Sequence, residues 1–465
     1  MWRTYVICVL IGLLLVSTGS NIVLMRQLLT VQSDTDRLRS RLTAAESAQN
    51  SLQQQVDQLK VATPGTRSTP AAVPTLAVGG PDRILLQQIE DDVAGLRGLQ
   101  PKRDVTLRFL DQQALQGFLV NRFNNDYLPS EREADQKLLT RLGLVGPNDD
   151  VPQTLLDILQ EQVIGVYNQD DKVMYIVSDS NQFGPLEKDT FAHEFTHALQ
   201  DQYYDLTKLA PKHPSNDDRA LAILALTEGD AVLMQRLWAQ EKMSQTEIDQ
   251  LNQSGTESKL FSAPLFLRQQ LLFPYVDGFN FVRQMYQTRG GYPGVDQVFR
   301  NPPDSTEQIL HIDKYRSGEK PIPVKLADLS AGSLGPGWRS IKSNVLGELD
   351  LRLILEQLTD PARAARSASG WGGDRYQLLE KDGRQALAVK SVWDTENDAR
   401  NFFDALNSGL KNHFAAAAVD EASASRQALT ASDVATDVRR NGANVLVVIS
   451  FDRPSADAIV AAAGA

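Results

Sequence analysis

Two histidines and a glutamate lie within five residues of one another, at His193, Glu194 and His197. The apolar residues around them predict a helix, and side chains four residues apart lie on the same face of a helix. Two neutral imidazoles at this spacing can bind one Zn²⁺ from the same side. Glu194 is rotated by about 100° from His193, where a carboxylate can hold a water molecule and act as its general base. The pattern therefore predicts a zinc site with hydrolytic chemistry.

A third candidate ligand lies on a second apolar helix that we predict downstream. Glu228 is deep inside the run from Ala220 to Leu233, where an unpaired carboxylate would be costly to bury. Two His and one Glu with an open water position form a known catalytic zinc set, so we expect Glu228 to complete the site. Asp230 points elsewhere on this helix, and we expect it to orient a ligand histidine. The alternative for Glu228 is a helix-end carboxylate or a partner of Arg236.

The pattern His193-Glu194-x-x-His197, followed by Glu228 on a second helix, resembles the gluzincin branch of the zincin metallopeptidases. The resemblance covers residues 163–235. It implies an α+β, zincin-like catalytic domain, Zn²⁺ as the cofactor, and a peptide or protein as the substrate. One position departs from the family pattern, because gluzincins often have Asp four residues after the ligand Glu and this chain has Val232.

Two β-rich runs precede the predicted metal helix and flank a polar join of five residues, which predicts a β-hairpin. In zincins a strand before the metal helix forms the edge of the cleft. The resemblance therefore implies that the second run, through Val173, Tyr175 and Val177, binds the substrate backbone by strand addition. An ordinary sheet strand is the alternative interpretation.

Peptide hydrolysis also needs a donor for the oxyanion on the carbonyl under attack, and His or Tyr suits that role. The segment from Asn301 to His311 predicts a short helix that begins at Ser305 and ends at His311, ahead of Tyr315. His311 and Tyr315 are therefore the candidate oxyanion donors. A structural histidine at a helix C-terminus is the alternative for His311.

The overall composition limits the classes of partner. A length of 465 residues predicts two to four structural units. The net charge of −11 and the pI near 5.1 argue against a nucleic-acid partner and against binding to an anionic lipid surface. Cys8 is the only cysteine, so no intrachain disulfide can form.

Residues 5–25 form an apolar run, and about 20 apolar residues suffice to span a bilayer. We predict a transmembrane anchor at residues 1–25, with the catalytic domain on the extracytoplasmic side of the cell membrane. The alternative is a cleaved signal peptide and secretion, with Tyr5–Val16 as the apolar region and Ser17–Ser20 as the cleavage site.

The next segment predicts a stalk. Apolar residues recur at alternating steps of four and three over residues 24–59, which is a heptad pattern. It favours a coiled-coil stalk at residues 26–60 and a parallel homodimer, with a single helix or disorder as the alternative. Residues 61–81 are rich in Pro, Ala and Thr and predict a linker.

The rest of the chain predicts two domains, a metallopeptidase domain at residues 82–320 and a small α+β domain at residues 321–465. In the first domain periodicity predicts helices at 82–99, 106–124, 136–144, 152–160, 186–204, 219–242 and 265–288. Pro274 should kink or split the last of these, and residues 245–255 read as a surface loop. In the second domain the same reasoning predicts helices at 345–358, 396–410 and 455–463, and strands at 376–380, 386–392, 434–439 and 444–451.

These features support two hypotheses. The first is a membrane-anchored zinc peptidase in which His193, His197 and Glu228 hold the metal and Glu194 is the general base. The alternative is a non-catalytic tethered module of the cell envelope with a structural or vestigial zinc site. An intact Glu194 favours the first hypothesis, because a purely structural site has no use for that carboxylate.

Overall fold

The computed structural model describes residues 80–162, 165–177, 183–211, 214–253 and 258–464. The predicted anchor at residues 1–25 and the predicted stalk at residues 26–60 lie outside these ranges, as does nearly all of the predicted linker. Within the described ranges, every helix is too short or too polar to cross a membrane.

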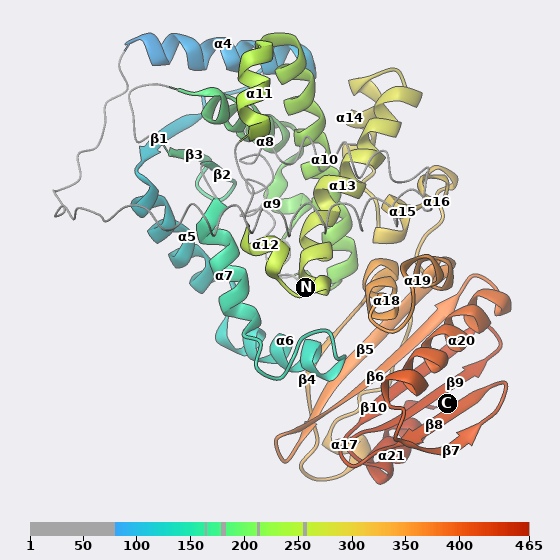
Figure 1. The fold of residues 1–465 in the computed structure, drawn as a ribbon. Helices are drawn as coiled ribbons and strands as arrows, with labels where there is room; N and C mark the ends of the chain where they lie inside the picture. Colours follow the sequence, from blue (N-terminus) through green and yellow to red (C-terminus); the bar gives the residue numbers. More distant parts are fainter. Residues whose placement is uncertain (1–79, 163–164, 178–182, 212–213, 254–257, 465) are drawn as a thin grey trace, which may run out of the picture.

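The N-terminal part of the molecule consists of helices packed around a three-stranded sheet (Figure 1). Its elements in chain order are α4 (Gly80–Arg97), β1 (Thr106–Leu110), α5 (Gln112–Asp126), α6 (Pro129–Arg141), α7 (Val151–Gln162), β2 (Gly165–Asn168), β3 (Val173–Val177), α8 (Pro185–Tyr204), α9 (Leu206–Leu209), α10 (Asp217–Lys242), α11 (Gln245–Gln253), α12 (Lys259–Ser262), α13 (Leu265–Thr288), α14 (Tyr292–Arg300), α15 (Thr306–Leu310) and α16 (Ile312–Ser317).

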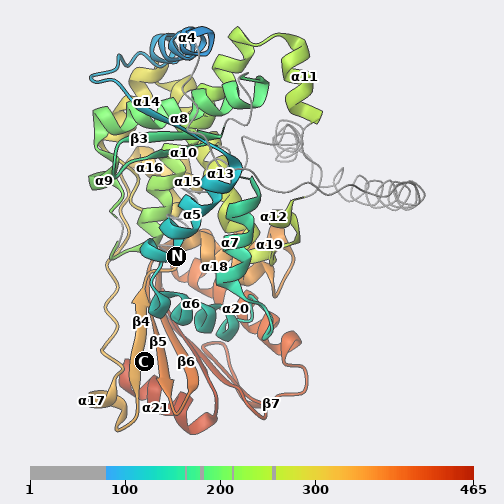
Figure 2. The same cartoon turned by 90° about the vertical axis from the view of Figure 1, so that its left-hand side faces the viewer.

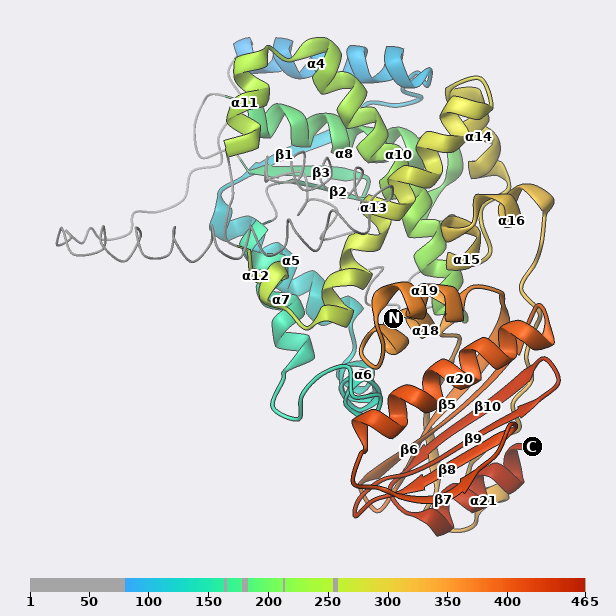
Figure 3. The ribbon, with the colours of Figure 1, turned by 45° about the vertical axis from the view of Figure 1, so that its right-hand side comes forward.

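The C-terminal part is built on a seven-stranded antiparallel sheet of order β4-β5-β6-β10-β9-β8-β7. Helices α20 and α21 cover opposite faces of this sheet (Figure 3). The elements in chain order are α17 (Ala331–Leu334), β4 (Arg339–Asn344), α18 (Gly347–Glu356), α19 (Pro361–Ala368), β5 (Trp371–Lys381), β6 (Arg384–Trp393), α20 (Glu396–His413), β7 (Ala418–Ala422), β8 (Arg426–Thr430), β9 (Ala435–Asn441), β10 (Asn444–Ser450) and α21 (Arg453–Ala463).

The mixed α+β class agrees with the sequence prediction, and so does the β2–β3 hairpin, in which Gly165 pairs with Ile176 and Asn168 with Val173. The residues at 106–110 were expected to start a helix and instead form β1. Leu107 and Phe109 alternate with polar neighbours, and this period of two matches a strand that pairs with β3 in parallel.

Two further predictions about helices need correction. The expected loop at 245–255 contains α11, because Ser244 and Glu247 cap its first turn with reciprocal side-chain hydrogen bonds. Lys188 on α8 also forms an ion pair of 2.8 Å with Glu247. Pro274 lies inside α13, which runs unbroken from Leu265 to Thr288, so the proline does not split that helix.

Helices α10 and α13 cross at two glycines. A Cβ atom added to Gly278 would lie 2.2 Å from the carbonyl oxygen of Ala225, and one added to Gly229 would lie 2.3 Å from the carbonyl oxygen of Gly278. Only glycine lets the two backbones approach this closely. Because Gly229 follows Glu228 directly, this crossing also fixes the position of the candidate ligand.

We expect Gly278→Ala to lower the free energy of unfolding by about 3 kcal/mol or more, since the added methyl group meets rigid backbone. Urea titration followed by circular dichroism measures the effect. Gly117→Ala on α5 is the control, because that site has open space around it, and Ala should stabilise an open helical position by about 0.5–1 kcal/mol. Equal stability of the two variants would contradict the close crossing.

The Trp371-Gly372-Gly373-Asp374 segment supports the start of α18. The Asp374 carboxylate accepts hydrogen bonds from the backbone N–H groups of Leu346 and Gly347 and from the Trp371 indole. A Cβ atom on Gly373 would lie 2.2 Å from the Ile322 carbonyl oxygen. The segment therefore has a structural role within the C-terminal part, where it holds the start of α18.

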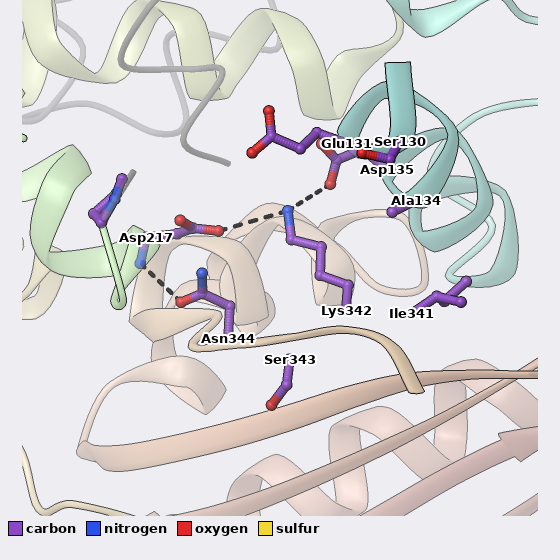
Figure 4. A pocket seen from close by; sticks show the side chains of 10 residues that line it. Ser130, Glu131, Ala134, Asp135, Asp217, Ile341, Lys342, Ser343 and Asn344 are labelled. Carbon is purple, nitrogen blue, oxygen red and sulfur yellow. Dashed lines mark hydrogen bonds and ion pairs between the residues drawn. The ribbon is translucent and has the colours of Figure 1, made fainter. Parts of the chain in front are cut away.

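The N-terminal helices and the C-terminal sheet are stacked end to end (Figure 2). The first turn of α10 lies at one contact between them (Figure 4). Lys342 of β4 lies 2.6 Å from Asp135 on α6 and 3.7 Å from Asp217 on α10. The backbone N–H of Asp217 donates to Asn344 Oδ1 at 3.0 Å, and the side chain of Asp218 accepts two hydrogen bonds from Thr306. The helix that carries Glu228 is therefore anchored at its N-terminus on the C-terminal sheet.

A second charged contact between the parts makes stability depend on pH. Glu380 of β5 contacts Lys137 of α6 at 2.5 Å and Arg339 of β4. These cations lower the pKa of Glu380 from 4.5 to about 2. A depressed folded-state pKa stabilises the protein above pH 4.5, and the stabilisation is lost as the pH falls from about 4.5 to about 2.

We expect Glu380→Gln to lower the free energy of unfolding at pH 7 by about 1–3 kcal/mol, the typical contribution of hydrogen bonds to a charged group. The difference from wild type should shrink at pH 3, where the carboxylate starts to lose its charge. Denaturant titrations at the two pH values test this, with Glu241→Gln on the surface of α10 as the control. A difference that stays constant with pH would rule out the charged contact as its cause.

Candidate metal centre

Helices α8 and α10 bring the three predicted ligands together. Helix α8 begins with Gly184 as the N-cap and Pro185 at the first position, and Asp205 ends it in the left-handed conformation. Asn216 caps α10 by accepting a hydrogen bond from the Arg219 N–H. The two helices pack side by side, with the β2–β3 hairpin against α8 (Figure 3).

The ligand atoms of these three residues converge on one point. The Nε2 atoms of His193 and His197 are 3.1 Å apart, and they lie 3.3 and 3.4 Å from Glu228 Oε2. His193 and Glu228 are almost completely buried. Glu228 Oε2 accepts no hydrogen bond from any residue that the structure describes. The predicted ligand set is thus assembled in space, and its donor atoms fit the preferences of Zn²⁺.

The pKa values of the clustered groups indicate that a positive charge stabilises this arrangement. Burial alone would lower the pKa of His197, but the Glu228 carboxylate raises it to about 9. Burial would raise the pKa of Glu228, but the two histidines lower it to about 2. Three acceptor atoms this close together are stable only with a proton or a metal cation between them.

Glu194 faces the same point from its predicted position. Its Oε2 accepts a hydrogen bond of 2.6 Å from the backbone N–H of Tyr167, and its Oε1 has no hydrogen-bond partner among the described residues. Burial raises the pKa of the Glu194 carboxyl above its ordinary value. A cavity of about 20 Å³ separates it from the ligands and is lined by Tyr167, Gln169, Glu194, His197, Leu206, Thr227 and Glu228. This space holds about one water molecule.

Asp230 does not contact a ligand histidine directly. Its Oδ2 accepts a hydrogen bond of 2.9 Å from Gln200, and Gln200 Oε1 lies 2.9 Å from His197 Nδ1. On the other side of the cluster, Gln235 Oε1 lies 3.3 Å from His193 Nδ1. The prediction that Asp230 orients a ligand histidine is thus corrected, because Gln200 lies between Asp230 and His197 and the contact is indirect.

The sequence interpretation missed Gln200 and Gln235, although helical spacing could have identified both. Gln200 lies three residues after His197 on α8, and Gln235 lies seven residues, or two turns, after Glu228 on α10. Tyr167 was also missed, because its contribution is a backbone N–H, which no residue type reveals.

The predicted role of β3 in strand addition is wrong. β3 is the central strand of its sheet, so Val173, Tyr175 and Val177 pair with β1 on one side, and β2 lies on the other. A peptide cannot add to a strand whose two edges are already paired. β2 is the outer strand beside the cluster, and its Tyr167 lines the cavity.

The predicted oxyanion donors have partners elsewhere. His311 Nε2 lies 2.8 Å from Glu348 Oε1, and the Tyr315 hydroxyl donates to the Asn301 carbonyl oxygen at 2.7 Å. Neither residue lines the cavity beside Glu194. The structure therefore does not bring His311 or Tyr315 to the candidate centre, and it favours the structural alternative for His311.

Comparison with known proteins matched a family model to a part of the chain that does not contain this site. A model of a domain of unknown function, DUF8575, matches residues 337–460, which lie in the C-terminal part. No curated protein matches the chain. A crystal structure from Chloroflexus aurantiacus, described as a "putative hydrolase with a novel fold", is 18% identical and covers 51% of this chain and 89% of that chain, with a TM-score of 0.35. A TM-score this low carries no argument about fold or activity.

Proposed function

We propose that this protein is a zinc-dependent peptidase in which His193, His197 and Glu228 hold the metal and Glu194 is the general base. The observation that carries the proposal is the convergence of two imidazole nitrogens and one carboxylate oxygen within 3.4 Å of one another. Two His and one Glu are the ligands of known catalytic zinc sites. Zn²⁺ bound there would supply Lewis acidity toward water and toward the substrate carbonyl.

The carboxylate of Glu194 would move the proton in this reaction. The Tyr167 N–H holds one carboxylate oxygen, which leaves Oε1 to accept a proton from the water in the cavity. The resulting hydroxide would attack the carbonyl carbon of the peptide bond. Glu194 would then pass the proton to the amine nitrogen as the C–N bond breaks. Its raised pKa suits a group that must take up a proton and later release it.

The substrate class rests on the resemblance of residues 163–235 to gluzincins. Within the described ranges the cluster contains no fourth His, Cys, Asp or Glu, which is consistent with a position left open for water. The proposed anchor at residues 1–25 and the proposed dimeric stalk at residues 26–60 would hold the peptidase at the outer face of the cell membrane.

The small size of the cavity favours a second candidate, a non-catalytic tethered module with a structural zinc. A cavity of about 20 Å³ admits water but not a peptide. Peptidase activity therefore requires more space beside the cluster, whereas a structural site requires none.

Elemental analysis and a peptide-library digest separate the two candidates. We expect about one zinc per purified full-length chain, cleavage of library peptides, loss of cleavage on treatment with a chelator, and recovery when zinc is restored. Zinc binding without cleavage of any peptide would favour the tethered module. Absence of zinc from the folded chain would exclude the peptidase and favour a tethered module with a vestigial site.

A further inference from the structure

We infer that Gln200 and Gln235 are positioning residues that hold His197 and His193 in the one tautomer whose Nε2 atom can bind a metal. The inference rests on the proposed function only in that it takes the cluster to be a metal site. A neutral imidazole carries its proton on either Nδ1 or Nε2, and only the unprotonated nitrogen can be a ligand. The amide partner of the other nitrogen therefore decides whether the site can form.

Gln200 determines the tautomer of His197 without ambiguity. Its Nε2 donates to the carbonyl oxygen of Thr227 and to Asp230 Oδ2, both at 2.9 Å. Because neither partner has a hydrogen to give, the amide cannot rotate by 180° without losing both bonds. Its Oε1 must therefore face His197 Nδ1 at 2.9 Å, and that nitrogen must carry the proton. Gln200 is fully buried, so water cannot replace this contact.

Arg97 keeps Asp230 in the role of an acceptor. Its Nε donates to Asp230 Oδ2 at 3.1 Å, and its Nη1 donates to Asp296 at 2.8 Å. The guanidinium also lies over the ring of Tyr292 at 4.4 Å. Asp230 thus accepts hydrogen bonds from both Arg97 and Gln200 at the same carboxylate oxygen. The last residue of α4 thus supports a ligand on α8 through Asp230 and Gln200.

Gln235 has the same arrangement with a looser contact. Its Nε2 donates to Asp189 Oδ2 at 2.6 Å, and its Oε1 lies 3.3 Å from His193 Nδ1. Arg236 is a cation whose charge acts on Asp189, as that of Arg97 acts on Asp230. The longer distance predicts that Gln235 restrains His193 less strongly than Gln200 restrains His197.

The first test is the zinc affinity of full-length variants, measured by competition with a chromophoric chelator. We expect Gln200→Leu to weaken zinc binding by about 10–100-fold, the usual effect of removing such a partner. Gln235→Leu should have a smaller effect. Gln270→Leu is the matched control, because Gln270 is also buried and donates to a buried carboxylate, Asp350, at 2.8 Å. The control should keep wild-type zinc affinity even where its stability falls.

A rescue variant separates positioning from general damage to the fold. Gln200→Glu alone places a second carboxylate beside Asp230 and should weaken zinc binding. Gln200→Glu combined with Asp230→Asn keeps an acceptor for His197 Nδ1 and removes the contact between two carboxylates, although the Thr227 carbonyl oxygen loses its donor. We expect the double variant to recover about tenfold of the affinity that Gln200→Glu alone loses.

Nitrogen NMR of zinc-loaded protein labelled at histidine gives a readout independent of activity. The chain has only five histidines, and we expect His193 and His197 to carry their protons on Nδ1. Wild-type affinity in Gln200→Leu, a double variant no better than Gln200→Glu, or Nε2 protonation at His197 would overturn the inference. Wild-type protein that binds no zinc would instead refute the proposed function, so the two failures are distinguishable.

Discussion

Replacing Glu194 with Gln should lower peptide hydrolysis by at least about 10²–10⁴-fold, the usual contribution of a general base, while the zinc content stays at the wild-type level. The amide keeps the size of the side chain, and Gln Oε1 can still accept the Tyr167 N–H. It cannot take a proton from water, so the step that forms hydroxide loses its base. The zinc ligands His193, His197 and Glu228 are untouched. The measurements are zinc per chain and the rate of cleavage of a peptide that wild type cleaves.

Glu187→Gln is the control for this variant, because Glu187 lies in the first turn of the same helix, away from the cavity lining. It should retain wild-type rates and zinc. Full activity in Glu194→Gln would refute the mechanism in which Glu194 is the general base. Loss of zinc in the same variant would instead assign Glu194 to the ligand set.

Replacing Glu228 with Ala should remove zinc from the purified protein. The loss of an outer partner of a ligand costs about 10–100-fold in metal affinity, so the loss of a ligand itself should cost more than about 100-fold. The carboxylate also supplies the negative charge that raises the pKa of His197 to about 9. Without it, the pKa of His197 should fall, because burial disfavours the charged imidazole. Chelator competition and elemental analysis measure the first effect, and histidine NMR over a pH titration measures the second.

The control for this substitution is Glu241→Ala, an exposed carboxylate at the end of the same helix that pairs with Lys242. It should bind zinc as wild type does. If Glu228→Ala also bound zinc with undiminished affinity, Glu228 would not be a ligand, and the third ligand would have to come from a residue outside the described cluster.

The cavity beside Glu194 is lined by Tyr167 of β2, Leu206 of α9 and Thr227 of α10. If the proposed peptidase widens this cavity to admit a peptide, these elements must move apart. Helix α10 is held at one end by the C-terminal sheet through Asp217 and at its centre by the crossing with α13. Opening by movement of β2 or α9 therefore disturbs fewer contacts than movement of α10.

Local sequence patterns predicted the elements that carry the chemistry. The spacing of His193 and His197 placed both on one face of a helix, and the cost of burying Glu228 pointed to a shared cation. The hairpin and most helices followed from periodicity in the same way. The predictions of the helices and the hairpin succeeded because such an element is specified by residues that are close in sequence, whatever packs against it. The shared cation stays a prediction.

Only the tertiary structure decided which residues, far apart in the sequence, contact the cluster or its ligands. The resemblance to gluzincins implied that β3 is an edge strand that could bind peptide, but the pairing of β1 on its far side makes it central. His311 has the right chemistry for an oxyanion donor, but α18 brings Glu348 to it instead. Arg97 and Asp230 lie 133 residues apart, and no local pattern links them. The sequence by itself thus determined the helices that carry the proposed ligands and the proposed base. Contacts between distant segments decided the strand order and the partners of these side chains, because those contacts depend on packing across the whole chain.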